Sequence, residues 1–300
     1  MATFAESIWS RTTIGGNLLI LVFGKTGQVA TELQNSGDVL ALGREQADFS
    51  DPRACENKIR SLAPHVVINA AAYTAVDKAE ANEKFATVIN GDTPTILAQV
   101  CAEMKIPIVH ISSDYVFDGS GKSAWKPGDA TSPQNAYGRS KLAGEKGILG
   151  SGANYVILRT SWVISSHGTN FVKSMLHLSE TKDKLTVVED QIGGPTPAQD
   201  IAQVCMMIAK QLLVNPSKSG IYHYCGTPNI SWAGLASEIF LQANRPTVVA
   251  PIQSDCYTRS TKRPLNSRMD CSLTNKIFGI KQPNWRMGLN KILKELEVIV

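Results

Sequence analysis

Along the first 165 residues, short and largely apolar runs alternate with longer stretches whose apolar positions recur at helical spacing. The apolar runs lie at residues 17–23, 38–44, 65–72, 106–111 and 154–163. Such runs are typical of strands that are buried on both faces of a parallel sheet. A long stretch between two of them, Phe85–Met104, has a helical pattern despite Gly91 and Pro94. The alternation predicts an α/β fold built on one doubly wound parallel sheet.

The pattern changes after residue 165, where strand signals become fewer and turn residues more frequent. An amphipathic helix is expected at residues 198–213, followed by one more apolar strand, which would return the chain to the main sheet. We expect a main domain at 17–165 with a return segment at about 197–226, and a smaller C-terminal domain formed by 166–196 and 227–300.

A glycine turn follows the first apolar run directly and leads into a helical pattern. Gly24, Gly27 and Ala30 form a Gly-x-x-Gly-x-x-Ala spacing, which only partly matches the Gly-x-Gly-x-x-Gly fingerprint. A strand, a glycine turn and a helix N-terminus together suit a pyrophosphate, because the backbone can approach the anion and free N–H groups face it. This stretch indicates a dinucleotide-binding site.

The end of the second apolar run bears on which dinucleotide binds. A site selective for NAD usually carries an acid there, about 20 residues after the turn, whereas an arginine accommodates the 2′-phosphate of NADP. This chain has Gly43-Arg44, which favours NADPH and leaves NADH as the alternative if Arg44 is only a surface residue. Asp48 and Phe49 follow in a loop that we expect to close over the adenine.

Tyr137 and Lys141 stand four residues apart in the segment 132–146, for which Ser132-Pro133 supplies a helix start signal. Their side chains therefore leave the same helix face one turn apart. An ammonium close to a phenol would lower the phenol's pKa, so the pair is a candidate proton donor, although alone it is more often an ordinary surface pair. Ser113 precedes Tyr137 by 24 residues, at the end of an apolar run, where its hydroxyl could share a carbonyl oxygen with the phenol.

Composition narrows the function further. Charged residues make up 19% of the chain and the net charge of +4 is spread along it, so nucleic-acid binding has no electrostatic support. The six cysteines show no metal-ligand spacing and indicate reduced thiols in a cytoplasmic protein without a cysteine-based metal site. No apolar run reaches the ~18 residues of a membrane helix. Residues 1–16 have no signal-peptide pattern and are interpreted as a disordered extension or an artefact outside the fold.

Together these motifs resemble the extended short-chain dehydrogenase/reductases, and within them the dTDP-4-dehydrorhamnose reductase family. The resemblance covers residues 17 to 296. It rests most on the following stretches: 23–29, 69–80, 113–117, 159–163, 190–196 and 263–268. It implies a Rossmann-type sheet with a smaller C-terminal substrate-binding domain. It also implies NADPH-dependent reduction of the C4 ketone of a dTDP-sugar, dTDP-4-dehydro-L-rhamnose, to dTDP-L-rhamnose for cell-surface polysaccharide synthesis.

The resemblance assigns roles residue by residue. It makes Tyr137 the general acid, Lys141 its partner and a ligand of the nicotinamide ribose, and Ser113 the second hydroxyl, where threonine is usual in the family. The cofactor-binding residues would be Gly24, Thr26, Gly27, Gln28, Val29, Arg44, Asp48, Phe49, Ala70, Ala71 and Tyr73. The substrate-binding residues would be Ser113, Asp114, Tyr137, Trp162, Arg263 and Arg268, the two arginines facing the diphosphate.

Some questions stay open at this point. Some family members bind Mg²⁺ through glutamates at a dimer interface; Glu32 matches one such position, but Gln199 stands where another glutamate would be, so no metal ligand is assigned. A homodimer is compatible with the sequence. The alternatives are another nucleotide-sugar reductase or epimerase, or a non-catalytic regulatory subunit on the same scaffold, which would lack the Ser113, Tyr137 and Lys141 set.

Overall fold

The computed structural model describes residues 18–256 and 261–300, so the expectation for residues 1–16 lies outside the described residues. Within them the main sheet has six parallel strands in the order β10-β5-β4-β3-β1-β2. Their bounds are Ile20–Phe23 (β1), Val39–Leu42 (β2), Val66–Asn69 (β3), Ile108–Ser113 (β4), Tyr155–Thr160 (β5) and Gly220–His223 (β10). The prediction of a doubly wound parallel sheet is confirmed.

The strand order places a topological switch between β1 and β3. From β1 the chain crosses to β2 on one side, then returns to β3 on the other side of β1. At such a point the loops after neighbouring strands diverge, and the crevice between them at the carboxyl ends is where open α/β sheets bind ligands. The glycine turn at residue 24 follows β1 and the three alanines at 70–72 follow β3, so both border this crevice.

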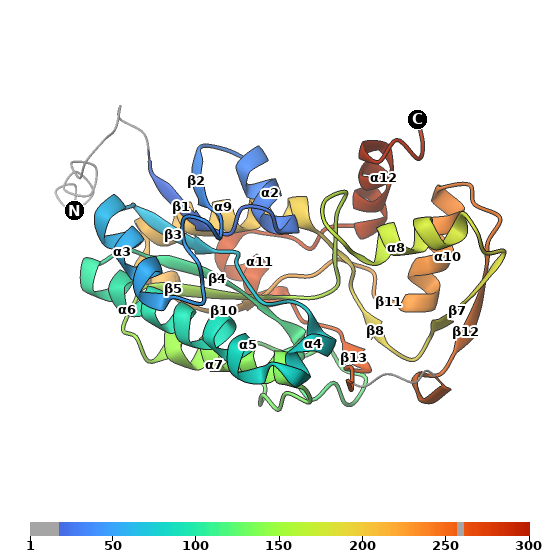
Figure 1. The fold of residues 1–300 in the computed structure, drawn as a ribbon, viewed down its shortest axis with the longest axis horizontal. Helices are drawn as coiled ribbons and strands as arrows, with labels where there is room; N and C mark the ends of the chain where they lie inside the picture. Colours follow the sequence, from blue (N-terminus) through green and yellow to red (C-terminus); the bar gives the residue numbers. More distant parts are fainter. Residues whose placement is uncertain (1–17, 257–260) are drawn as a thin grey trace.

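Helices cover both faces of the sheet (Figure 1). One face packs α2 (Gln28–Asn35), α9 (Ala198–Val214) and α11 (Ser272–Phe278), and the other packs α3 (Pro52–Leu62), α6 (Thr93–Met104) and α7 (Ala136–Leu149). Two short helices, α4 (Val76–Ala81) and α5 (Glu83–Thr87), precede α6. Buried aliphatic side chains such as Leu33 on one face and Leu97 on the other form the two cores. None of the described helices has the length and hydropathy to span a bilayer.

A third hydrophobic core lies beside the sheet, at the right of Figure 1. It is built from β7 (Lys184–Val188), β12 (Val248–Ile252), α8 (Phe171–Ser179), α10 (Trp232–Gln242) and α12 (Trp285–Glu295). Two further short sheets are separate from the main one. One pairs β6 (Val163–Ile164) with β9 (Thr196–Pro197), and the other pairs β8 (Ile192–Gly193) with β11 (Ile230–Ser231) and β13 (Asn266–Ser267). The predicted second domain included residues 272–278, but α11 packs on the sheet instead, where Phe278 meets Tyr222 at 4.8 Å between ring centroids.

Two expected helices differ in detail from the prediction. The helix that carries Tyr137 begins at Ala136 rather than at Ser132-Pro133, because Asn135 is its cap and accepts a hydrogen bond from Gly138 N at 2.8 Å. The stretch Phe85–Met104 is interrupted by a π-helical turn at Val88–Asp92 (η1), after which Pro94 occupies the first turn of α6. A wider turn before the proline removes the clash that a proline would cause inside an α-helix.

A buried ion pair joins α7 to the sheet. Arg159 on β5 donates to Glu145 on α7 through Nε at 2.9 Å and Nη2 at 2.6 Å, and both side chains are almost fully buried. Ser112 on β4 also donates to Glu145, at 2.6 Å. The guanidinium lies over the ring of Phe117, 4.9 Å from its centroid. These bonds satisfy both charges inside the protein and fix α7 against β4 and β5.

We expect Glu145→Gln to lower the free energy of unfolding by about 3–5 kcal/mol, because it leaves the Arg159 guanidinium buried without a counter-charge. The control is Glu83→Gln, which removes the exposed partner of Arg139 at 2.6 Å. An exposed pair of this kind is worth below about 1 kcal/mol, since solvent screens it. Urea unfolding of both variants measures the difference, and equal losses would contradict a structural role for the buried pair.

Candidate active site

A cleft of about 970 Å³ lies over the carboxyl ends of the parallel strands, at the switch between β1 and β3. All the residues predicted to bind the cofactor line it, as do Ser113, Asp114, Tyr137, Lys141, Trp162 and Arg263. The structure therefore brings these residues together, although they are spread over more than two hundred positions of the sequence. Arg268 is the exception. It is absent from the cleft lining, and its guanidinium donates to Asn266 Oδ1 at 3.1 Å instead.

The glycine turn makes the cleft's floor at the end of β1. Gly24 has φ +109°, a conformation that side chains rarely adopt, and a Cβ there would lie 3.2 Å from the Ala70 and Ala71 backbone. Glycine is therefore required for two strand ends to approach each other closely. Around Gly27 a Cβ would meet nothing within 4 Å, and no side chain caps the N-terminus of α2 there. Free backbone N–H groups at that helix end suit an anion.

The loop at residues 165–170 also borders this end of the cleft, a position that the sequence did not indicate. Asn170 donates to Gln28 Oε1 at 3.1 Å, which ties the loop to the start of α2. Gly168 and Thr169 line the cleft beside it. The loop carries no motif, and its contact with Gln28 spans 142 positions of sequence, so no local signal could have revealed it.

The end of β2 carries charges of both signs. Arg44 is mostly exposed, and its Nε donates to Asp48 Oδ2 at 3.1 Å. The pKa of Asp48 is lowered, mainly by the hydrogen bonds from Ser50. The Glu45 carboxylate lies over Gly43, where a Cβ would be 2.5 Å from it, and pairs with Lys25 at 3.8 Å. Near the end of β2, Arg44 and Lys25 could therefore contact a phosphate. The Glu45 carboxylate lies beside them on an exposed side chain.

The three predicted catalytic residues meet where β4 and α7 face each other. Ser113 ends β4, and its hydroxyl donates to Asp114 Oδ1 at 3.0 Å. Tyr137 lies in the first turn of α7, and Lys141 follows one turn later with its side chain almost fully buried. The Lys141 ammonium does not point to solvent. Its Nζ donates to the Ile111 carbonyl at 2.7 Å and faces His110 Nε2 at 3.3 Å.

The expectation of a lowered pKa for Tyr137 is wrong for this structure, because burial outweighs the effect of the nearby Lys141. Burial raises the pKa of the phenol above its usual range, and the charge of Asp114 adds to the rise, whereas a hydrogen bond with Ser113 opposes it. Lys141 is itself affected: burial lowers its pKa to about 8, against the charge of Glu145. The phenol therefore stays protonated, the form that a proton donor needs.

Tyr115 is a residue of the cleft that the sequence did not suggest. Its ring meets that of Tyr137 edge-on, with centroids 5.3 Å apart. Arg263 donates to its hydroxyl at 3.1 Å and to Asp77 at 2.9 Å, while Arg263 Nε is buried and has no partner among the described residues. Arg263 thus reaches the cleft as predicted, and it also holds Tyr115 against Tyr137.

Three aromatic side chains close the other end of the cleft. Trp162 and Trp232 stack with centroids 3.6 Å apart, and Phe171 meets Trp232 at 4.5 Å. Trp162 adopts φ +48°, an uncommon backbone conformation for a large side chain that is often found at functional sites. Only Trp162 was predicted. Trp232 and Phe171 begin α10 and α8, and only the packing of these helices brings them to the cleft.

Comparison with known proteins agrees with this geometry. The family model described as "RmlD substrate binding domain" matches residues 18–298. A dTDP-4-dehydrorhamnose reductase of Sinorhizobium fredii is 39% identical over 284 residues, which cover 91% of this chain and 96% of that protein. The chain belongs to the dTDP-4-dehydrorhamnose reductase family.

Solved structures of this family are similar as well. The reductase of Clostridium acetobutylicum superposes with a TM-score of 0.88 at 33% identity, covering 93% of this chain and 100% of the other. The reductase of Bacillus anthracis, solved in complex with NADP, gives a TM-score of 0.86 at 31% identity, covering 93% and 99%. The family resemblance inferred from the sequence motifs is confirmed.

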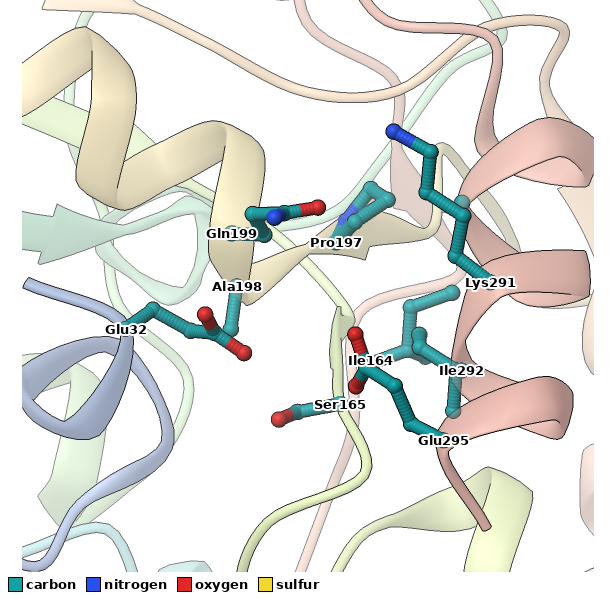
Figure 2. Close-up of a pocket in the computed structure, with 10 residues that line it drawn as sticks. Glu32, Ile164, Ser165, Pro197, Ala198, Gln199, Lys291, Ile292 and Glu295 are labelled. Carbon is teal, nitrogen blue, oxygen red and sulfur yellow. The ribbon is translucent and has the colours of Figure 1, made fainter. Parts of the chain in front are cut away.

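The position at which the family resemblance suggests Mg²⁺ lies outside the cleft. Glu32, Gln199, Lys291 and Glu295 border a cavity of about 10 Å³ between α2, α9 and α12 (Figure 2). Glu32 Oε1 lies 3.2 Å from His167 Nε2, and its pKa is raised mainly by burial. In the described part of the chain, no group of three or more His, Cys, Asp or Glu side chains could hold a metal ion. The carboxylates of Glu32 and Glu295 and the amide oxygen of Gln199 are of the kind that Mg²⁺ accepts, but the Lys291 ammonium at the same cavity repels a cation, so no metal ligand is assigned.

The buried carboxyl of Asp114 should make the stability of the protein depend on pH. Its pKa rises from 3.8 to about 6, because burial outweighs the hydrogen bonds from Ser267 and Ser113. A raised carboxyl pKa favours the folded state at low pH, and this contribution is lost as the pH rises from 3.8 through 6. We expect Asp114→Asn to raise the free energy of unfolding above pH 6 by at most about 3 kcal/mol, and to have little effect near pH 4.

Urea unfolding of Asp114→Asn between pH 4 and pH 8 measures this effect. Asp118→Asn is the matched control, since hydrogen bonds from Ser120 lower the pKa of Asp118 and its side chain is partly exposed. The control should be slightly less stable than the parent protein at neutral pH. A difference between Asp114→Asn and the parent that does not change with pH would contradict the raised pKa.

Proposed function

We propose that this protein reduces the C4 ketone of dTDP-4-dehydro-L-rhamnose with NADPH and forms dTDP-L-rhamnose for cell-surface polysaccharide synthesis. The proposal rests on the position of Ser113, Tyr137 and Lys141 in one cleft. They lie in it together with the glycine turn at residue 24 and the stacked rings of Trp162 and Trp232. Membership of the reductase family supports the same substrate. We further propose a cytoplasmic location, with which the free cysteines among the described residues agree, and a homodimer as the assembly to be tested.

The cleft fits a dinucleotide on the features of its own residues. Gly24 and the N-terminus of α2 leave room and N–H donors for a pyrophosphate, and Thr160 Oγ1 is buried at the end of β5 without a partner among the described residues. Arg44 and Lys25 would attract a 2′-phosphate, and Glu45 would have to turn away from it. The homologous reductase that binds NADP supports the choice of NADPH. When bound, the reduced nicotinamide supplies the hydride.

The residues of the chain supply orientation and the proton. A 4-keto sugar needs a proton on the oxygen that becomes an alkoxide when its carbon is reduced. Tyr137 would donate this proton, and the Ser113 hydroxyl would donate a hydrogen bond to the same oxygen, a preorganised form of stabilisation. Lys141 would favour the phenolate that remains. Trp162 and Asp114 would contact the sugar, and Arg263 would lie on the diphosphate side.

Two other functions would use the same scaffold. An epimerase or a reductase for another nucleotide sugar would share the Tyr137 and Lys141 pair but would require a different sugar pocket. A regulatory subunit would keep the dinucleotide-binding turn but lack the Ser113, Tyr137 and Lys141 set. All three of these residues line this cleft, which favours an enzyme. The assay for the main proposal is consumption of NADPH or NADH by purified protein with dTDP-4-dehydro-L-rhamnose. No consumption of either cofactor would refute the enzymatic proposal.

We expect Tyr137→Phe to lower kcat by 10²-fold or more, since general acid catalysis contributes about 10²–10⁴-fold. KM for the sugar should change little, because the ring and its packing remain. The matched control is Tyr222→Phe, which removes a hydroxyl that donates to the Lys218 carbonyl outside the cleft. Steady-state kinetics of both variants decide the point; normal turnover by Tyr137→Phe would remove the proposed acid.

We expect Arg44→Ala to raise KM for NADPH about tenfold, with little change for NADH, because only NADPH carries the 2′-phosphate that a guanidinium would contact. Arg60→Ala serves as the control, as Arg60 is an arginine of α3 that pairs with Glu103 and does not line the cleft. Equal changes in KM for both cofactors in the Arg44 variant would contradict its role in cofactor selection.

A further inference from the structure

A buried chain of polar groups lies behind Lys141, on the side away from the cleft. Asn69 at the end of β3 contacts His110 on β4, with Asn69 Nδ2 lying 3.0 Å from His110 Nδ1. His110 Nε2 in turn lies 3.3 Å from Lys141 Nζ. Asn69 and His110 are almost completely shielded from solvent. Neither Asn69 nor His110 lines the cleft.

The direction of these hydrogen bonds follows from a backbone group. Ala71 N can only donate, and it donates to Asn69 Oδ1 at 3.1 Å. The amide of Asn69 therefore turns its NH₂ group towards His110, and His110 Nδ1 must accept. Burial, together with the charge of Lys141, holds the pKa of His110 well below its usual value, so the ring is neutral. A neutral ring that accepts at Nδ1 carries its proton on Nε2.

This tautomer matters because Nε2 faces Lys141. An ammonium group has three donors and no acceptor, so a charged Lys141 would oppose the Nε2–H donor of His110. A neutral amine can accept from Nε2–H and still donate to the Ile111 carbonyl, from which Nζ lies 2.7 Å. The ring could reverse its tautomer only if Asn69 also turned, and Ala71 N would then lose its acceptor.

We propose that Asn69 and His110 are positioning residues that hold the Nε2–H tautomer and thereby make the proton on Lys141 easy to release. The chain of bonds links the Lys141 amine to Ala71, whose backbone borders the cofactor cleft. In the proposed reduction a charged Lys141 favours the phenolate of Tyr137. Activity would therefore fall on the alkaline side where Lys141 loses its proton, near pH 8. This consequence rests on the proposed function, whereas the tautomer does not.

The other ionisable groups around Lys141 do not provide the same effect. On α7, Glu145 raises the pKa of Lys141, but its carboxylate is already shared by Arg159 and Ser112. Tyr137 is held in its neutral form by burial. The charge of Asp114, on the turn after β4, raises the pKa of the Tyr137 phenol. Burial and the His110 donor thus act in the same direction on Lys141, and only the donor can be removed by a single substitution.

The first test measures the tautomer directly and needs no substrate. Nitrogen-15 NMR of the full-length protein, which has five histidines, can be assigned with a His110→Gln variant. We expect His110 to show a protonated Nε2 and an unprotonated Nδ1 from pH 6 to pH 9. A ring protonated at Nδ1, or an imidazolium in this range, would overturn the proposal even if the protein proved to be an active reductase.

The second test compares two substitutions at His110. His110→Phe fills the space but removes the donor, so the Lys141 ammonium meets no opposing N–H. His110→Gln can accept from Asn69 through Oε1 and donate to Lys141 through its amide nitrogen. We expect the alkaline limb of kcat to move up by about one pH unit, a tenfold change in proton affinity, in His110→Phe. The limb should stay within about 0.3 unit of the parent protein's in His110→Gln.

The titration of Lys141 can also be followed without turnover, from the carbon-13 shift of its Cε, assigned with Lys141→Met. We expect this shift to titrate about one pH unit higher in His110→Phe than in the parent protein. An unchanged titration in His110→Phe, or equal shifts in both His110 variants, would overturn the proposal. If His110→Phe does not fold, the tautomer measurement decides alone. Absence of reductase activity would refute the proposed function and leave both NMR readouts intact.

Discussion

The close approach of α7 to its neighbours is the constraint on which the rest of the site depends. A Cβ at Gly138 would overlap the Tyr115 carbonyl, and a Cβ at Gly144 would overlap the carbonyl of Asn90. The helix backbone therefore lies directly on the turn after β4 and on the π-helical turn before α6. This approach sets how far Tyr137 reaches into the cleft and how deeply the residues that follow it are buried.

Because of this packing, polar side chains on one face of α7 are buried away from water. Tyr137, Lys141 and Glu145 follow one another at intervals of one turn, so all three point from α7 towards β4 and β5. Glu145 is balanced by Arg159, whereas among the described residues Lys141 contacts a backbone carbonyl and a histidine. Burying a charge without a counter-charge is costly, so the charged form of Lys141 becomes less stable than in water. The packing that orients Lys141 thus also lowers its pKa.

The sequence predicts the sheet well because its strands are buried on both faces and read as continuous apolar runs. It also predicts the glycine turn after β1, where the backbone itself requires Gly24, and the Tyr137–Lys141 pair, whose spacing places both on one helix face. These features are local, or repeat with a simple period. What decides them lies within a few residues of each, so no tertiary information is needed.

The features that could not be predicted depend on contacts between distant segments. Trp232 reaches the cleft only because α10 packs beside Trp162, and the loop at 165–170 only because Asn170 bonds to Gln28. Arg268 shows the reverse case: its residue type suits a diphosphate, but Asn266 holds its guanidinium elsewhere. Residue type indicates which chemistry a side chain could perform, whereas only its neighbours decide where that side chain points.

The state of Tyr137 shows why this distinction matters for mechanism. A tyrosine near a lysine suggests a phenol that ionises easily, yet here burial dominates and the phenol keeps its proton. A donor in a reduction benefits from this, because it must remain protonated until negative charge develops on the substrate oxygen. The charge of Lys141 is then needed only as the proton leaves. A lysine whose own proton is loosely held suits that task only at a pH low enough to keep it charged, so the groups that tune Lys141 set the working range of Tyr137.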